Sequence, residues 1–80
     1  MNAVAIESVL DSHAVPNRLP VIFYGTSGAR YLGSVHANDN RSMTALRPEV
    51  DGMLRIFGLS ATYLSRAETR NGRRFIVAHG

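Results

Sequence analysis

The chain has 80 residues and a mass of 8.7 kDa, with nine arginines, no lysine, six acidic residues and a formal net charge of +3. This length excludes a two-domain enzyme or a full dinucleotide-binding fold, and we expect one α+β domain over residues 1–80. The absence of cysteine excludes disulfides, thiolate metal sites and a cysteine nucleophile. The sequence is 45% hydrophobic and has no bilayer-length apolar run and no basic N-terminal leader, which predicts a soluble cytoplasmic protein.

The N-terminal segment, residues 3–10, fits two conformations. Val4 and Ile6 alternate as in a strand, whereas Ile6, Val9 and Leu10 would also suit one face of a helix. We therefore predict an additional N-terminal strand or helix and leave the choice between them open. A connecting loop follows over residues 13–20, because this stretch contains two prolines.

A first β-hairpin is predicted in the next part of the chain. Residues 19–24 are a short apolar run of strand-forming residues, and two glycines, Gly25 and Gly28, follow it. Glycine adopts the positive backbone angles that a hairpin turn needs, so we expect a second strand over residues 30–36. A helix over residues 29–37 is the competing interpretation, but glycine in its interior costs about 1 kcal/mol, and the hairpin is favoured.

The clearest periodic pattern predicts an amphipathic helix that ends before Gly58. Six apolar residues between positions 43 and 57 recur mostly at spacings of three and four, which places them on one helical face. Proline is tolerated near the start of a helix, so Pro48 predicts that the regular helix begins at Arg47 or just before. Gly58 suits the position that ends a helix. The apolar residues are Met43, Leu46, Val50, Met53, Leu54 and Phe57.

A second hairpin is predicted around Asn71 and Gly72, the dipeptide most typical of a two-residue hairpin loop. With these two residues as the loop, Arg70 faces Arg73. One face of the hairpin is then expected to pack under the helix, and it holds Ala61, Tyr63, Ala67, Ile76 and Ala78. The other face is half apolar and half basic, and it holds Leu64, Arg66, Glu68, Arg70, Arg73, Phe75, Val77 and His79. The expected fold is α+β: a small antiparallel sheet of two β-hairpins packed on one amphipathic helix.

The positive charge is concentrated near the C-terminus. Residues 1–40 have two arginines against three acidic residues, whereas residues 41–80 have seven arginines against three. Guanidinium groups bind phosphate and carboxylate through paired hydrogen bonds and stack on bases. A solvated hairpin tip, whose charge prevents edge-to-edge association, is the other interpretation. We predict a partner-binding hairpin, with Tyr63 near enough to stack, formed by Arg66, Arg70, Arg73, Arg74 and Phe75.

No group of residues predicts catalysis, a metal or a cofactor. His13, His36 and His79 are too far apart in the sequence for a short metal-binding motif. Glu49 and Asp51 lie two residues apart on the predicted helix and point in different directions, so they do not form a catalytic pair. We therefore expect a protein that is not an enzyme, with no cofactor and no metal.

In its size, its lack of cofactor motifs and its single α+β domain, the chain resembles the small inhibitor proteins of phages and mobile elements, of the anti-CRISPR type. This resemblance is one of size and composition, and no motif carries it. It implies a protein that occludes a surface of a larger protein or nucleoprotein complex, such as a CRISPR effector, and blocks the binding of target DNA. The alternative is a nucleic-acid-binding protein that uses the arginine-rich hairpin. Both a monomer and a homodimer suit a chain of this size, and we expect no membrane partner.

Overall fold

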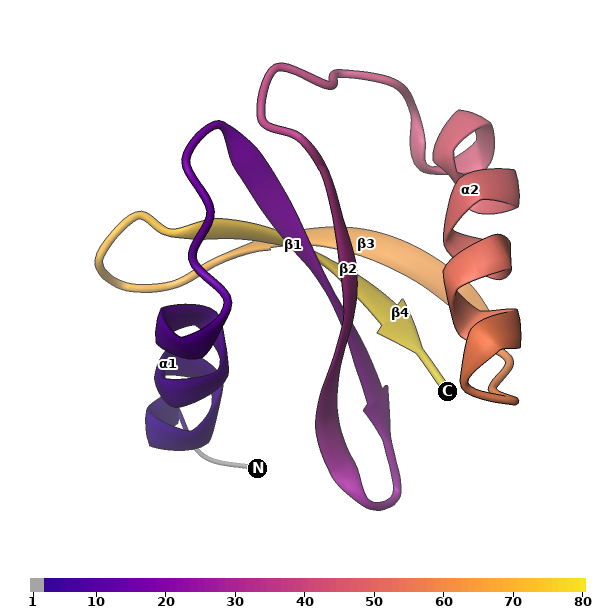
Figure 1. Ribbon diagram of the computed structural model, residues 1–80, viewed down its shortest axis with the longest axis horizontal. Helices are drawn as coiled ribbons and strands as arrows, with labels where there is room; N and C mark the ends of the chain where they lie inside the picture. Colours follow the sequence, from indigo (N-terminus) through magenta and orange to yellow (C-terminus); the bar gives the residue numbers. More distant parts are fainter. Residues whose placement is uncertain (1–2) are drawn as a thin grey trace.

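A computed structural model describes residues 3–80 of the chain, with side chains from Ile6 onward. Within these residues the chain forms two helices and four strands (Figure 1). In chain order these are α1 Ala3–Ser12, β1 Arg18–Gly25, β2 Gly28–His36, α2 Met43–Ile56, β3 Tyr63–Glu68 and β4 Arg74–His79. The strands form one sheet in the order β2-β1-β4-β3. The predicted α+β class is confirmed.

The sheet is mixed, which differs from the predicted pair of antiparallel hairpins on one helix. β1 and β4 lie in its centre and run parallel, while β1–β2 and β3–β4 are antiparallel. The two central strands are the most apolar ones: Val21 and Ile22 are fully buried, and residues 75–78 are all buried. A strand buried on both faces has a continuous apolar run rather than alternation. Both faces therefore need a cover, and the amphipathic helix on which the two hairpins were predicted to pack covers only one of them.

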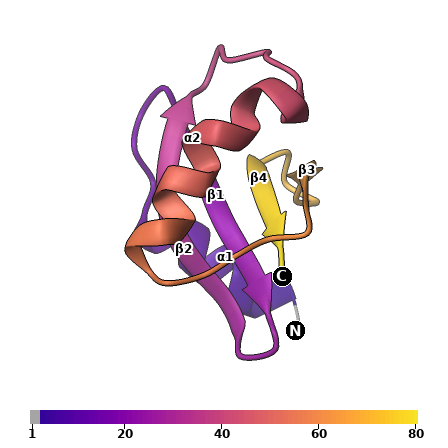
Figure 2. The same ribbon diagram turned by 90° about the vertical axis from the view of Figure 1, so that its right-hand side faces the viewer.

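Each face of the sheet is covered by one helix (Figures 1 and 2). α2 buries Leu46, Val50 and Leu54 against one face. α1 buries Ile6 and Leu10 against the other, and in Figure 2 it lies behind the sheet while α2 lies in front. The sequence left a strand and a helix open for the N-terminal segment, and the described residues of this segment form a helix. Positions 1 and 2 lie outside the described residues.

The first hairpin has the predicted turn. Gly25 pairs with Gly28, so the loop consists of the two residues between them, and Gly28 has a φ of 104°. The register shifts where β1 passes from position 21 to 22, which leaves Leu32 of β2 as an extra residue in a β-bulge. The bulge lets Leu32 and Val35 both lie in the core on the α2 side, although they are three residues apart.

Helix α2 begins at Met43, four residues before the predicted start. Ser42 caps it, since its Oγ accepts a hydrogen bond of 3.1 Å from the backbone N–H of Ala45. Leu46 is fully buried in this first part of the helix. The cap and the burial offset the backbone hydrogen bond that Pro48 cannot donate, and Pro48 lies inside the helix.

The end of α2 is as predicted. Gly58 has a φ of +67°, a left-handed conformation that favours glycine. Its N–H donates to the carbonyl of Arg55, and the N–H of Leu59 donates to the carbonyl of Leu54. These two bonds satisfy carbonyl groups that would otherwise lack partners at a helix C-terminus.

The second hairpin is shifted by one residue from the predicted register. Glu68 pairs with Arg74, and the N–H of Thr69 donates to the carbonyl of Arg73 at 2.8 Å. The loop therefore has three residues, 70–72, with Gly72 at a φ of 80°, which is the arrangement of a three-residue hairpin loop. Because side chains alternate along a strand, this shift exchanges the faces of β3 relative to those of β4. Ile76 and Ala78 lie on the α2 side as predicted, but Leu64 lies there with them, whereas Ala67 lies on the α1 side with Phe75 and Val77.

Candidate functional site

The four arginines of the second hairpin have different environments. Arg73 forms ion pairs with α1: its Nη1 lies 3.3 Å from Glu7 Oε2 and its Nη2 lies 2.5 Å from Asp11 Oδ1. These contacts join the tip of the hairpin to the first helix, across more than 60 residues of sequence. Arg73 is therefore a structural contact as much as a surface charge.

Arg66 holds the opposite side of the hairpin. Its Nη2 donates hydrogen bonds to the backbone carbonyls of Asp39 at 3.2 Å and of Arg41 at 2.8 Å. Arg41 in that loop forms ion pairs with Asp39 of the same loop at 2.6 Å and with Glu49 of α2 at 2.7 Å. The hydrogen bonds from Arg41 lower the pKa of the Asp39 carboxyl to about 2. Arg66 thus fixes β3 to a loop that is itself held by charged contacts.

Phe75 and Tyr63, which we expected to stack near these arginines, lie elsewhere. Phe75 is 6% exposed and packs in the core on the α1 side with Ile6 and Val77. Tyr63 lies at the far end of β3, where its ring stacks on His79 with centroids 4.1 Å apart. Phe75 therefore anchors the hairpin in the core and exposes little of its ring to a partner.

Arg70 and Arg74 are exposed, and within residues 3–80 their side chains have no ion pair or hydrogen bond. Elsewhere Arg41, Arg47 and Arg73 form ion pairs with five of the six carboxylates of the chain, all of which lie in the described range. Glu68 is the carboxylate that remains. The hairpin is therefore held by Arg66 and Arg73 and displays Arg70 and Arg74 to solvent.

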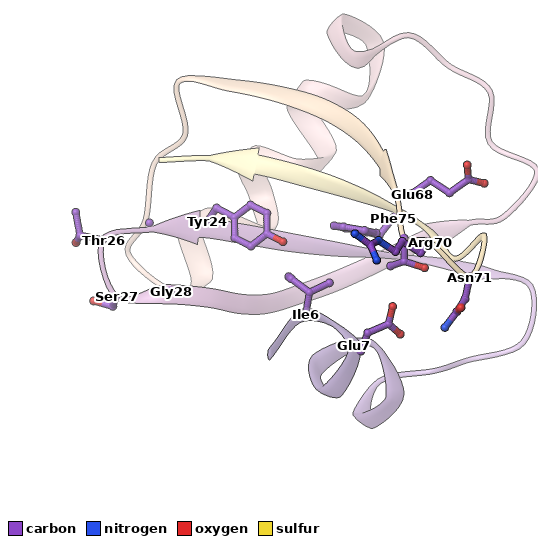
Figure 3. Close-up of a pocket in the computed structure, with 12 residues that line it drawn as sticks. Ile6, Glu7, Tyr24, Thr26, Ser27, Gly28, Glu68, Arg70, Asn71 and Phe75 are labelled. Carbon is purple, nitrogen blue, oxygen red and sulfur yellow. The ribbon is translucent and has the colours of Figure 1, made fainter. Parts of the chain in front are cut away.

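Arg70 lines an open hollow of 1290 Å³ on the α1 side of the hairpin (Figure 3). Tyr24 and Phe75 contribute apolar surface to it, and burial raises the pKa of Tyr24. Glu7 and Glu68 also line the hollow, so two carboxylates lie around it with one guanidinium group. The charged lining of this hollow therefore does not favour an anion.

Arg74 lines a second, smaller hollow of 530 Å³ where β1 and β4 begin. Arg18 and Arg73 line it too, although Arg18 lies far from the hairpin in the sequence. The parallel register pairs Val21 with Ile76, and extended back by three residues it brings Arg18 level with Arg73. Arg18 was missed in the sequence because only the pairing of β1 with β4 brings it to this site.

Residues 3–80 contain no cluster of three histidine, aspartate or glutamate side chains able to hold a metal ion. His13 stacks on Tyr31 at 3.9 Å, whereas His79 contacts Ser65 on the opposite edge of the sheet. Over the same range, neither α1 nor α2 has the length and apolar character needed to cross a membrane. Comparison with known proteins gives no match to any family model, curated protein or solved structure.

Proposed function

We propose that the chain is a non-enzymatic binding protein that docks on an acidic or phosphate-bearing surface of a larger protein or nucleoprotein complex. The observation that carries this proposal is the division of the hairpin arginines. Arg66 and Arg73 hold the hairpin from two sides, and Arg70 and Arg74 extend from it without a carboxylate partner in the described part of the chain. Charges on a held element lose less conformational freedom on binding than charges on a mobile loop.

The action of such a protein is occlusion. An interface of standard size covers about 800 Å² on each partner, which is about one sixth of the 4984 Å² surface of this chain. A domain bound in this way excludes other molecules from the covered surface by its bulk and needs no catalytic group. A CRISPR effector is one partner of this kind, and it is proposed from the size and composition of the chain.

The test compares charge reversal on and off the hairpin. A tagged wild-type chain is used to retain partners from host extract, beside R70E/R74E and the matched variant R30E/R55E. All four of these arginines are exposed and lack carboxylate partners within residues 3–80, so the two variants change the charge equally. We expect R70E/R74E to lose a specific partner and R30E/R55E to keep it. Equal retention by both variants contradicts the proposal.

Direct binding of single-stranded nucleic acid is the second candidate function, and one observation favours it. Tyr24, His79 and Tyr63 lie in register on three adjacent strands of the α1 face, and Tyr63 is 56% exposed. A base stacked on an aromatic ring contributes about 1–3 kcal/mol. The outer face of the Tyr63 ring extends the column that it forms with His79.

This second function has a measurable salt dependence. Two phosphate contacts, from the exposed Arg70 and Arg74, give a log–log salt slope of about −1.4 on a single strand, since each contact contributes roughly −0.7. Fluorescence anisotropy with a labelled oligonucleotide measures the slope, and Tyr63→Ala is expected to weaken binding while leaving the slope unchanged. Absence of binding at low salt excludes this function and leaves docking on a complex in place.

A further inference from the structure

The smaller hollow, at the end of the sheet where β1 and β4 begin, differs in chemistry from the larger hollow beside Arg70. Of the ten residues that line it, seven are apolar and three are arginines. No acidic side chain lines it, whereas Glu7 and Glu68 line the larger hollow beside Arg70. It therefore combines an apolar wall with positive charge.

The apolar side chains that line the hollow offer no hydrogen-bonding groups to a polar ligand. Leu10 and Leu19 are buried and form its floor, and Val15 is 51% exposed at its rim. Pro16 and Pro20 also line it, and proline has no backbone N–H to donate. A sugar, a base or a peptide backbone needs hydrogen-bond partners when it is buried, and the lining side chains offer only guanidinium groups. The body of a ligand that fits this wall is therefore apolar.

The charged part is held in place by the sheet. Arg18 donates from Nε to Ser34 Oγ at 3.1 Å and from Nη2 to the Ser34 carbonyl at 2.8 Å, which leaves Nη1 without a bond among the described residues. The Arg74 side chain has no ion pair or hydrogen bond among the described residues, and Glu68, its neighbour across the hairpin, is not within ion-pair distance of it. The charge of Arg73 is already balanced by ion pairs to α1. Arg18 and Arg74 therefore supply the net positive charge of this hollow.

We propose that this hollow binds a fatty-acid-type anion, with its carboxylate between Arg18 and Arg74 and its alkyl chain over Leu10, Leu19 and Val15. The volume of 530 Å³ lies within the roughly 300–1,000 Å³ that is common for small-molecule sites. Guanidinium groups bind carboxylates in strong, charge-assisted hydrogen bonds. This binding does not depend on docking through the hairpin, although Arg74 belongs to both surfaces.

Titration of the ¹⁵N-labelled chain with decanoate, followed by NMR, tests the proposal. We expect shift changes at residues 14–20, at position 37 and at positions 73–74. Decanol, which keeps the apolar body, and acetate, which keeps the charge, are each expected to bind at least about 10-fold more weakly, because each lacks one half of the interaction. Decanol binding as tightly as decanoate, or shift changes confined to other regions, overturns the proposal.

Three variants separate this site from the docking surface. Arg18→Gln is expected to weaken decanoate binding about 10-fold, while Arg55→Gln, which removes an exposed arginine of α2, leaves it unchanged. Val15→Asp places a carboxylate at the exposed rim, where the fold tolerates it, and is expected to abolish decanoate binding. Neither Arg18 nor Val15 belongs to the docking surface, so both variants are expected to retain the partner. Equal decanoate affinity in R18Q, V15D and R55Q contradicts the proposal.

Discussion

Both hairpins of the sheet are antiparallel strand pairs, but they differ in the number of charged residues near the tip. The β1–β2 hairpin closes with a two-residue loop, and residues 23–29 around its tip include no charged side chain. The β3–β4 hairpin closes with residues 70–72 and carries arginines in and beside the loop. Arg73 ties it to α1, and Arg66 ties it to the loop before α2.

The comparison shows that arginines close together in sequence can divide into two roles. Those whose guanidinium groups meet carboxylates or carbonyls of distant segments hold the hairpin in place. Those that point away from such groups are displayed to solvent. Sequence proximity made Arg66, Arg70, Arg73 and Arg74 one cluster, and the tertiary contacts make them two pairs.

The largest effect is expected from Phe75→Ala. Because Phe75 is 6% exposed in the core, its removal is expected to lower the free energy of unfolding by about 3–5 kcal/mol. That is a large part of the roughly 4–12 kcal/mol expected for a domain of this size. Urea denaturation measures it, with Phe57→Ala, at a ring that is 40% exposed, as the control. Equal, small effects of the two changes would show that Phe75 is a surface residue.

The loop of the second hairpin gives the next largest effect. Gly72 has a φ of 80° and Asn71 does not have a positive φ, as expected of a three-residue loop. Gly72→Ala is therefore expected to lower the free energy of unfolding by about 1 kcal/mol or more, and Asn71→Ala by less than about 0.5 kcal/mol. Comparable losses in the two variants would instead indicate the two-residue loop, in which both positions require a positive φ.

The sequence predicted the local parts of this fold. Gly25 and Gly28 fit a loop of one length, the two residues between them, so the turn of the first hairpin was predicted correctly. The position of Gly58 at the end of α2 was also as expected. Asn71 and Gly72 fit both a two-residue and a three-residue loop, and the local pattern did not distinguish them. The continuous apolar run at residues 75–78 was the available signal for a central strand.

The candidate site was less predictable, because it depends on contacts between distant segments. The ion pair of Arg73 with Glu7 joins residues 66 positions apart, and no local pattern indicates it. Arg18 reaches the neighbourhood of Arg74 through the parallel pairing of β1 with β4. The predicted sheet of two antiparallel hairpins contained no parallel pairing of this kind.

Substitution of a holding arginine and of a displayed arginine is expected to change the free energy of unfolding by different, smaller amounts. Arg73→Gln removes partly exposed ion pairs and is expected to lower the free energy of unfolding by about 1 kcal/mol. Arg70→Gln and Arg74→Gln are expected to change it by less than about 0.5 kcal/mol, since their side chains have no partner in the described residues. Chemical denaturation of the three variants in one buffer measures the difference. A loss for Arg70→Gln as large as that for Arg73→Gln would contradict the division.

The smallest effect concerns the loop that Arg66 holds. Because Arg41 lowers the pKa of Asp39 from 3.8 to about 2, the folded state favours the ionised carboxyl. The resulting stabilisation is present above pH 4 and is lost as the pH falls through about 2. NMR titration of the Asp39 carboxyl carbon measures this pKa, and Arg41→Gln is expected to return it toward 3.8. An unchanged pKa in that variant would show that Arg41 is not its cause.

The most direct test of the division between holding and displayed arginines is ¹⁵N relaxation of their Nε–H groups. The contacts of Arg66 and Arg73 are expected to restrict these side chains on the picosecond to nanosecond timescale. Arg70 and Arg74 are expected to move freely on the same timescale. Similar order in all four side chains would contradict the account.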